Sequence, residues 1–153
     1  MQGAPVHACP LLARTGVGFR PGPPDARARI SVPDDAVPLL RPLLDGQDRE
    51  CGVLMALDTR HRVIATAVIS IGTAAHTFLA PREVYRDALA FGASAIVVAH
   101  NHPSGDATPS DDDRDLTRRL WRAGEIMGVE LLDHLVLGDP EWTSMARLGA
   151  CSA

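Results

Sequence analysis

Two histidines and an aspartate in one short stretch of the sequence have the residue types and spacing of a metal site. His100 and His102 lie two positions apart at the exit of an apolar run, so in extended backbone both imidazoles point to the same side. Asp113 follows after several prolines and glycines, which can turn the chain and return a carboxylate to the same place. Two neutral imidazoles and one carboxylate, with a fourth position left to water, form the open arrangement of a catalytic zinc site. The spacing therefore predicts one Zn²⁺ per chain, bound by these three residues.

Parts of this pattern also have a purely structural explanation. A lone His-x-His is weak evidence for a metal, and Ser110 with Asp113 three residues later is typical of the capping pair that opens a helix. The tight turn and the carboxylate that follows it are what favour the metal interpretation. Asn101 lies between the two histidines and should point away from the metal, where it supports the core or a loop; substrate contact is the alternative.

A sheet and helices must hold these residues, and the apolar patterns predict both. Continuous or β-branched apolar runs predict strands over residues 29–32, 51–57, 63–71, 95–99 and 129–137. Start signals, apolar spacing and stop signals predict helices over residues 34–45, 81–92 and 110–128. Pro38 and Pro42 weaken the prediction of the first helix. Strands and helices alternate, which predicts an α/β fold with a central sheet and helices packed on it.

Length and composition limit the class of protein. The 153 residues, 46% hydrophobic and 22% charged, fit one globular domain. We expect a Pro/Gly-rich arm over residues 1–27 and the folded domain over residues 28–153. No apolar run is long enough for a membrane helix and no secretory signal opens the chain, which predicts a cytoplasmic protein without a membrane partner. The net charge of −4 gives no general attraction to nucleic acid, and a local basic patch is the alternative source of one.

The motifs resemble a known family of metallopeptidases. His-x-His-Pro followed by Ser-x-x-Asp looks like the JAMM motif of MPN-type metallopeptidases. The fuller string at residues 100–105, Pro-Arg-Glu-Val at 81–84 and Asp-His-Leu at 133–135 resemble more closely the bacterial RadC-like branch. The likeness covers roughly residues 30–150 and implies a three-layer α/β/α, cytidine-deaminase-like fold with a mixed central sheet. Longer RadC-like proteins place a helical region before this domain, where this sequence has the Pro/Gly-rich arm.

By this resemblance each motif residue acquires a role. His100, His102 and Asp113 match the metal ligands of the family, and Ser110 matches its active-site serine. Asp133 and His134 are expected to be supporting or structural residues on opposite sides of their strand.

The resemblance also implies a glutamate upstream of the histidines as general base. Glu50 and Glu83 are the two glutamates before His100. Glu50 heads the apolar run 51–57, where the family's glutamate precedes a buried strand, whereas Glu83 is also explained as an acidic residue in a helix first turn. We therefore assign the base to Glu50 and keep Glu83 as the alternative. Ser110 would donate a hydrogen bond to the developing oxyanion of the substrate.

The function implied is that of a zinc-dependent metalloprotease of the JAMM type, which hydrolyses a peptide or isopeptide bond in an extended segment of a protein substrate. Strand addition at a sheet edge would bind such a segment. A metal-dependent hydrolase that processes DNA, as in a RadC-like repair protein, is one alternative, because a metal-activated water can also attack phosphorus. A non-enzymatic MPN interaction module is the other. A zinc deaminase is disfavoured, because the sequence has neither Cys-x-x-Cys nor His-x-Glu. The oligomeric state is not indicated.

Overall fold

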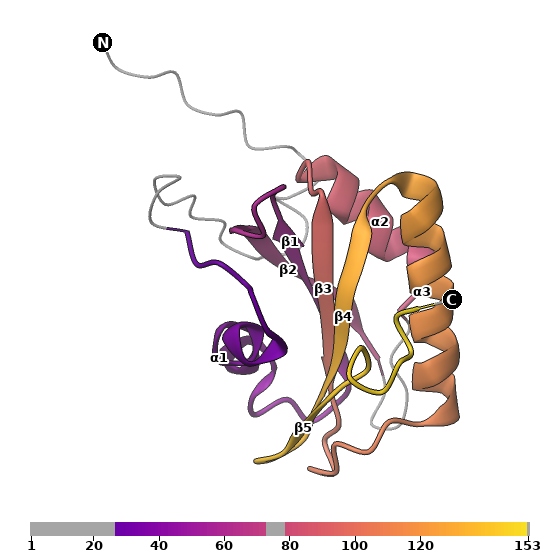
Figure 1. Ribbon diagram of the computed structural model, residues 1–153. Helices are drawn as coiled ribbons and strands as arrows, with labels where there is room; N and C mark the ends of the chain where they lie inside the picture. Colours follow the sequence, from indigo (N-terminus) through magenta and orange to yellow (C-terminus); the bar gives the residue numbers. More distant parts are fainter. Residues whose placement is uncertain (1–26, 73–78, 153) are drawn as a thin grey trace.

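The computed structural model describes residues 27–72 and 79–152, which form a five-stranded sheet with helices on both faces (Figure 1). The elements in chain order are α1 (Pro33–Leu44), β1 (Cys51–Leu57), β2 (Val63–Ile71), α2 (Pro81–Ala90), β3 (Ala95–Asn101), α3 (Asp111–Met127), β4 (Glu130–Leu137) and β5 (Trp142–Ser144). The strand order is β2-β1-β3-β4-β5, with β3 and β4 parallel and the other neighbours antiparallel. Helix α1 covers one face, and α2 and α3 cover the other. The predicted three-layer α/β/α fold with a mixed sheet is confirmed.

The predicted arm lies outside the described residues, apart from Arg27. In the part of the chain that the structure describes, no helix is both long enough and apolar enough to span a bilayer.

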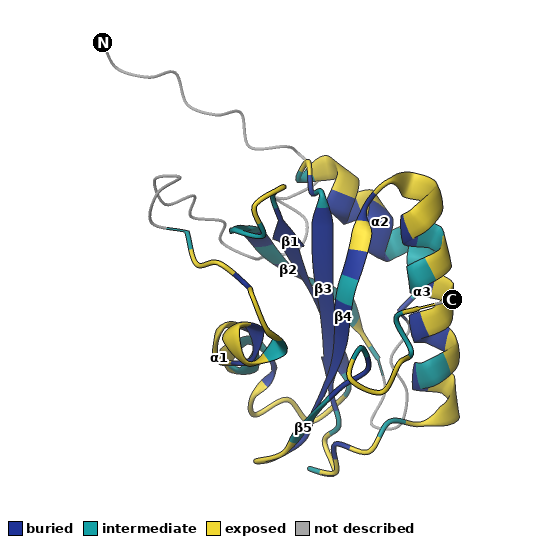
Figure 2. Cartoon of the chain, viewed as in Figure 1, coloured by how far each residue is buried: buried dark blue, intermediate teal, exposed yellow. Residues whose placement is uncertain are grey.

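Every residue of β1 and β3 is buried, because these neighbouring strands have helices on both faces (Figure 2). Their side chains alternate between two apolar clusters. Met55 and Val97 pack on the α1 side, whereas Leu54 and Val98 pack on the side of α2 and α3. This alternation decides which residues at the end of β3 face α3.

The predicted strand over residues 29–32 is wrong. Only an isolated bridge between Arg29 and Arg62 forms there. The backbone N–H groups of Ser31 and Val32 both donate to the Asp35 carboxylate, at 2.8 and 3.0 Å, and are not available to a strand partner. The segment instead leads into α1.

Helix α1 forms although it contains Pro38 and Pro42. Its Leu40 side chain is fully buried against the sheet, and Arg41 donates to the carbonyl oxygens of Gly138 and Pro140 at 2.8 and 3.0 Å. These tertiary contacts offset the weak helical propensity of the prolines. The bounds predicted for this helix, 34–45, are shifted by one residue from those observed.

Candidate metal centre

His100, His102 and Asp113 converge where β3 ends beside the start of α3. One ligand atom from each residue lies within 4.8 Å of the other two. His100 Nε2 lies 3.0 Å from His102 Nε2 and 3.1 Å from Asp113 Oδ1, and His102 Nε2 lies 3.4 Å from Asp113 Oδ2. His100 is fully buried, whereas 14% of the His102 side chain is exposed. Within residues 27–72 and 79–152, no other three His, Cys, Asp or Glu side chains are grouped in this way.

The turn after β3 holds His102 beside the end of β4. The backbone N–H of His102 donates to Leu137 O, and the N–H of Asp139 donates to Gly105 O, both at 2.9 Å. Gly105 has φ +84°, a conformation that glycine adopts without the strain of a side chain. Gly138 allows the two segments to approach closely, because a Cβ atom there would lie 2.2 Å from Gly105 O.

Replacing Gly138 with alanine should therefore push the motif turn away from β4 and weaken metal binding. The new methyl group would overlap Gly105 O, and the backbone segment that carries His102 would have to move. Zinc affinity, measured by competition with a chromophoric chelator, should fall. Gly92→Ala is the control: Gly92 has φ +69° with no atom within 4 Å of an added Cβ, so it tests general destabilisation. Equal zinc affinity in Gly138→Ala and wild type would contradict this role of the turn.

The first turn of α3 fixes the carboxylate of Asp113. Ser110 Oγ accepts from Asp113 N at 3.1 Å, and Asp113 Oδ2 accepts from Ser110 N at 2.8 Å, which is the predicted capping pair. Burial works to raise the pKa of Asp113, but hydrogen bonds with His100 and His102 outweigh it and hold the pKa well below its ordinary range. The carboxylate is therefore ionised and oriented toward the histidines.

The hydrogen bond at the far side of the His102 ring identifies its tautomer. His102 Nδ1 lies 2.8 Å from Asp106 O, and a carbonyl oxygen can only accept. Nδ1 therefore carries the proton in the neutral ring, and the lone pair of Nε2 faces Asp113. Asp113 can accept a hydrogen bond from the protonated ring, and this effect, opposed by burial, raises the pKa of His102.

The ligand atoms of this cluster fit a zinc ion. A bare imidazole nitrogen and a carboxylate face each other across 3.4 Å, an arrangement that is repulsive until a cation lies between them. Imidazole and carboxylate are ligands that Zn²⁺ accepts, and three protein ligands leave the open position of a catalytic site. The residues present could thus hold the predicted metal.

Glu50 lies next to this cluster. Strands β1 and β3 pair antiparallel with Gly52 opposite His100, so Glu50, just before β1, and His102, just after β3, lie at the same end of this strand pair. The charge of Glu50 adds to the rise in the pKa of His102, as expected for a nearby carboxylate. Glu83 instead forms ion pairs with Arg82 and Arg86 around the start of α2. Glu50 thus lies near enough to His102 for its charge to act there, whereas Glu83 has a different set of partners.

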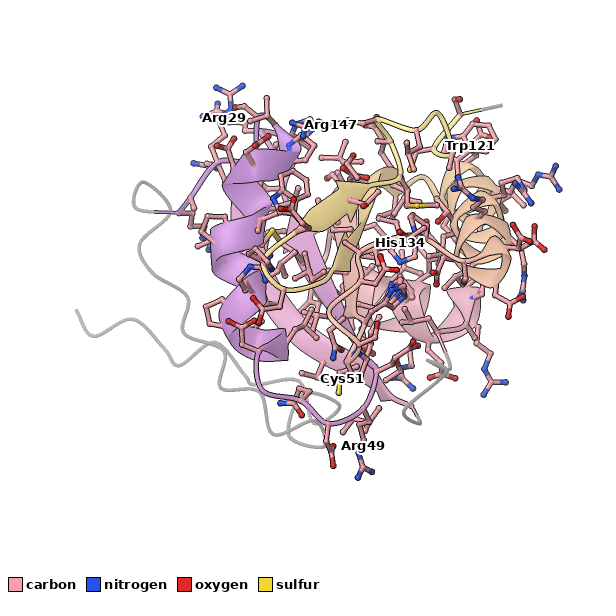
Figure 3. The ribbon with its side chains drawn as sticks, turned by 90° about the horizontal axis from the view of Figure 1, so that it is seen from below. Arg29, Arg49, Cys51, Trp121, His134 and Arg147 are labelled. Atoms are coloured by element: carbon pink, nitrogen blue, oxygen red, sulfur yellow. The ribbon has the colours of Figure 1, made fainter. Side chains whose placement is uncertain are left out.

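Asn101 points to the opposite face from the cluster and bonds to the backbone on both sides of Glu50. Its Oδ1 accepts from Cys51 N at 2.7 Å, and its Nδ2 donates to Arg49 O at 3.1 Å. Figure 3 shows Arg49 and Cys51 close together at one edge of the molecule. As predicted, Asn101 is a supporting residue. That it holds the segment carrying Glu50 follows only from the pairing of the strands, which the sequence does not show.

Two polar residues lie behind His100: His134, which the sequence analysis expected to be a supporting or structural residue, and Thr117, which it did not identify. His134 Nε2 lies 2.8 Å from His100 Nδ1, and His134 Nδ1 lies 2.7 Å from Thr117 Oγ1. His134 lies in the interior of the molecule (Figure 3). The parallel register, with Val98 beside His134, puts His134 on the same face as His100. Asp133 faces elsewhere and accepts from Ser144 Oγ. Thr117 lies one helical turn after Asp113, which is the signal that could have identified it.

A cleft opens beside the motif turn. Its volume is about 560 Å³, and its walls include Arg41, Asn101, His102, Gly105 and Asp139. The cleft therefore reaches one of the three clustered side chains from the side of α1.

Known proteins with similar sequences agree with this architecture. A family model described as "RadC-like JAB domain" matches residues 30–150. A UPF0758 protein of Desulforamulus reducens is 40% identical over 147 residues, which are 95% of this chain and 65% of that protein. The UPF0758 protein tlr1707 of Thermosynechococcus vestitus is 38% identical over 146 residues, 94% of this chain and 58% of that protein. A UPF0758 protein of Rubrobacter xylanophilus is 42% identical over 138 residues, 86% of this chain and 59% of that protein. The chain thus spans about six tenths of the length of these curated relatives, whose names state no activity.

Proposed function

The chain belongs to the RadC-like JAB domain family, and from that premise we propose that it is a zinc-dependent metallopeptidase that hydrolyses a peptide or isopeptide bond. The observation that carries the proposal is the cluster of His100, His102 and Asp113, with the charge of Glu50 acting on His102. Three candidate metal ligands that leave a position open, together with a nearby carboxylate, are the parts that metal-assisted hydrolysis needs.

Glu50 and Ser110 have different roles in the proposed reaction. When bound, zinc supplies a Lewis acid that makes a water molecule more acidic and polarises a carbonyl group. Glu50 accepts the proton of the attacking water and passes it to the leaving amine. Ser110 Oγ accepts from Asp113 N, and its own hydrogen has no partner among the described residues, so it is available to the substrate carbonyl oxygen. A hydrogen bond of this type contributes about 3 kcal/mol to the transition state.

The surroundings of the cluster favour an amide over a phosphodiester substrate. Arg41 donates to two backbone carbonyls, and Arg49 pairs with Asp48. Both guanidiniums thus already have partners, which disfavours them as clamps for a phosphate. The cleft beside His102 gives room for an extended peptide segment. We also propose that the substrate is cytoplasmic. The cysteine usage of the sequence fits a compartment in which thiols stay reduced.

The Asn101 contacts predict that this residue affects turnover more than metal binding. Asn101→Leu would leave the buried N–H of Cys51 without a partner, and the free energy of unfolding should fall by about 1–3 kcal/mol. Turnover should fall while zinc stays bound, because the segment that carries Glu50 is released on the face away from the ligands. Tyr85→Phe, which removes a buried hydrogen bond to Leu120 O, is the matched control and should keep full turnover. A normal rate in Asn101→Leu would refute this assignment.

A substrate screen tests the proposed function. Zinc-loaded protein is incubated with unstructured peptides, isopeptide-linked proteins, and single- and double-stranded DNA. We expect cleavage of amide bonds that stops with a chelator and returns with zinc. Chelator-sensitive cleavage of DNA without amide hydrolysis would establish the nuclease instead. Cleavage of none of them by zinc-loaded protein would favour the interaction module.

A further inference from the structure

Thr117 and His134 form a chain of short contacts behind the metal cluster. From Asp113 O the contacts run to Thr117 Oγ1 at 2.7 Å, to His134 Nδ1 at 2.7 Å, and from His134 Nε2 to His100 Nδ1 at 2.8 Å. Thr117, His134 and His100 are all fully buried. Each contact needs one hydrogen, and the number of hydrogens available decides the direction of every bond.

The first hydrogen is fixed by the backbone. Asp113 O is a carbonyl oxygen and has no hydrogen, so the contact of 2.7 Å requires the hydroxyl hydrogen of Thr117. A threonine hydroxyl has only one hydrogen, and Thr117 must therefore accept from His134. It follows that His134 carries a proton on Nδ1.

The second hydrogen follows from the role of His100 as a metal ligand. A zinc ion bound at His100 Nε2 would leave the single proton of the neutral ring on Nδ1. His100 Nδ1 would then donate to His134 Nε2, 2.8 Å away. His134 is fully buried, and within the described part of the chain its ring nitrogens contact only the hydroxyl of Thr117 and the ring of His100. One hydrogen is thus available for each of the three contacts.

We propose that Thr117 and His134 are positioning residues that hold His100 in the tautomer with its proton on Nδ1 and a bare Nε2 facing the metal. The inference rests on the metal site of the proposed function and adds residues that touch neither metal nor substrate. His102 is held in the same tautomer by a different acceptor, Asp106 O. Outer hydrogen bonds of this kind orient metal-binding histidines in general, although the acceptor here is a second histidine.

Thr117→Val separates this role from packing, because valine has the shape of threonine without the hydroxyl. The His134 proton then loses its acceptor and moves to Nε2, where it can donate to His100 Nδ1. His100 would in turn carry its own proton on Nε2, against the metal. Zinc affinity in Thr117→Val should fall by about 10- to 100-fold, and Thr117→Ser, which keeps the hydroxyl, should restore it. Thr66→Val on β2 is the matched control and should bind zinc like the wild type.

The experiment combines chelator competition for zinc with long-range ¹H–¹⁵N spectra of the histidine rings in the zinc-loaded full chain. The spectra should show the ring protons of both His134 and His100 on Nδ1. A wild-type His134 protonated on Nε2, or unchanged zinc affinity in folded Thr117→Val, would overturn the proposal. Neither readout uses hydrolysis, so an inactive protein that passes both tests would contradict the proposed function alone.

Discussion

Glu50→Gln should abolish hydrolysis and leave zinc bound. Glutamine has nearly the shape of glutamate but cannot accept the proton of the attacking water. Removal of a general base of this kind reduces the rate by about 10²- to 10⁴-fold. The charge of Glu50 acts on His102, but Glu50 is not one of the three clustered ligand residues, so the zinc content should not change. Rate and zinc content are measured on the same sample.

Glu83→Gln is the control for this result. Glu83 is engaged with Arg82 and Arg86, and its replacement should leave the rate close to that of the wild type. If Glu83→Gln were inactive and Glu50→Gln active, the base would have been assigned to the wrong residue.

His102→Ala should remove the metal itself. Elemental analysis of the wild type should give about one zinc per chain, and the variant should have lost most of it, because only one imidazole and one carboxylate remain. Hydrolysis should be lost with the zinc. His61→Asn is the matched control: His61 lies in a turn with φ +57°, which asparagine tolerates, and is not part of the cluster. Equal zinc in His102→Ala and wild type would exclude His102 as a ligand.

The sequence predicted the buried strands well, because a strand covered on both faces needs a continuous apolar run. This applies to β1 and β3, whose runs end at Leu57 and near His100. It failed where tertiary contacts decide the structure. Strand β5, Trp142–Ser144, has three residues and is too short to show a period. Helix α1 was predicted to within one residue, although the contacts of Leu40 and Arg41 that stabilise it are contained in no local pattern.

The candidate site was predictable only in part for the same reason. His100, His102 and Asp113 lie at the end of one strand, in the turn after it and at the start of the next helix, so their spacing carried the information. Glu50 could be assigned only through the family resemblance, because its place depends on the pairing of β1 with β3. The relation of His134 to His100 depends on the parallel register of β3 and β4, which sequence periodicity does not determine.

The most direct test of the metal centre is a crystal structure of the zinc-loaded protein with anomalous diffraction data collected at the zinc edge. The account predicts one strong anomalous peak per chain, about 2.0–2.2 Å from His100 Nε2, His102 Nε2 and an Asp113 carboxylate oxygen. The Glu50 carboxylate should lie near the open coordination position without ligating the metal. A peak at another group of residues, or no peak near these three side chains in zinc-loaded crystals, would contradict the account.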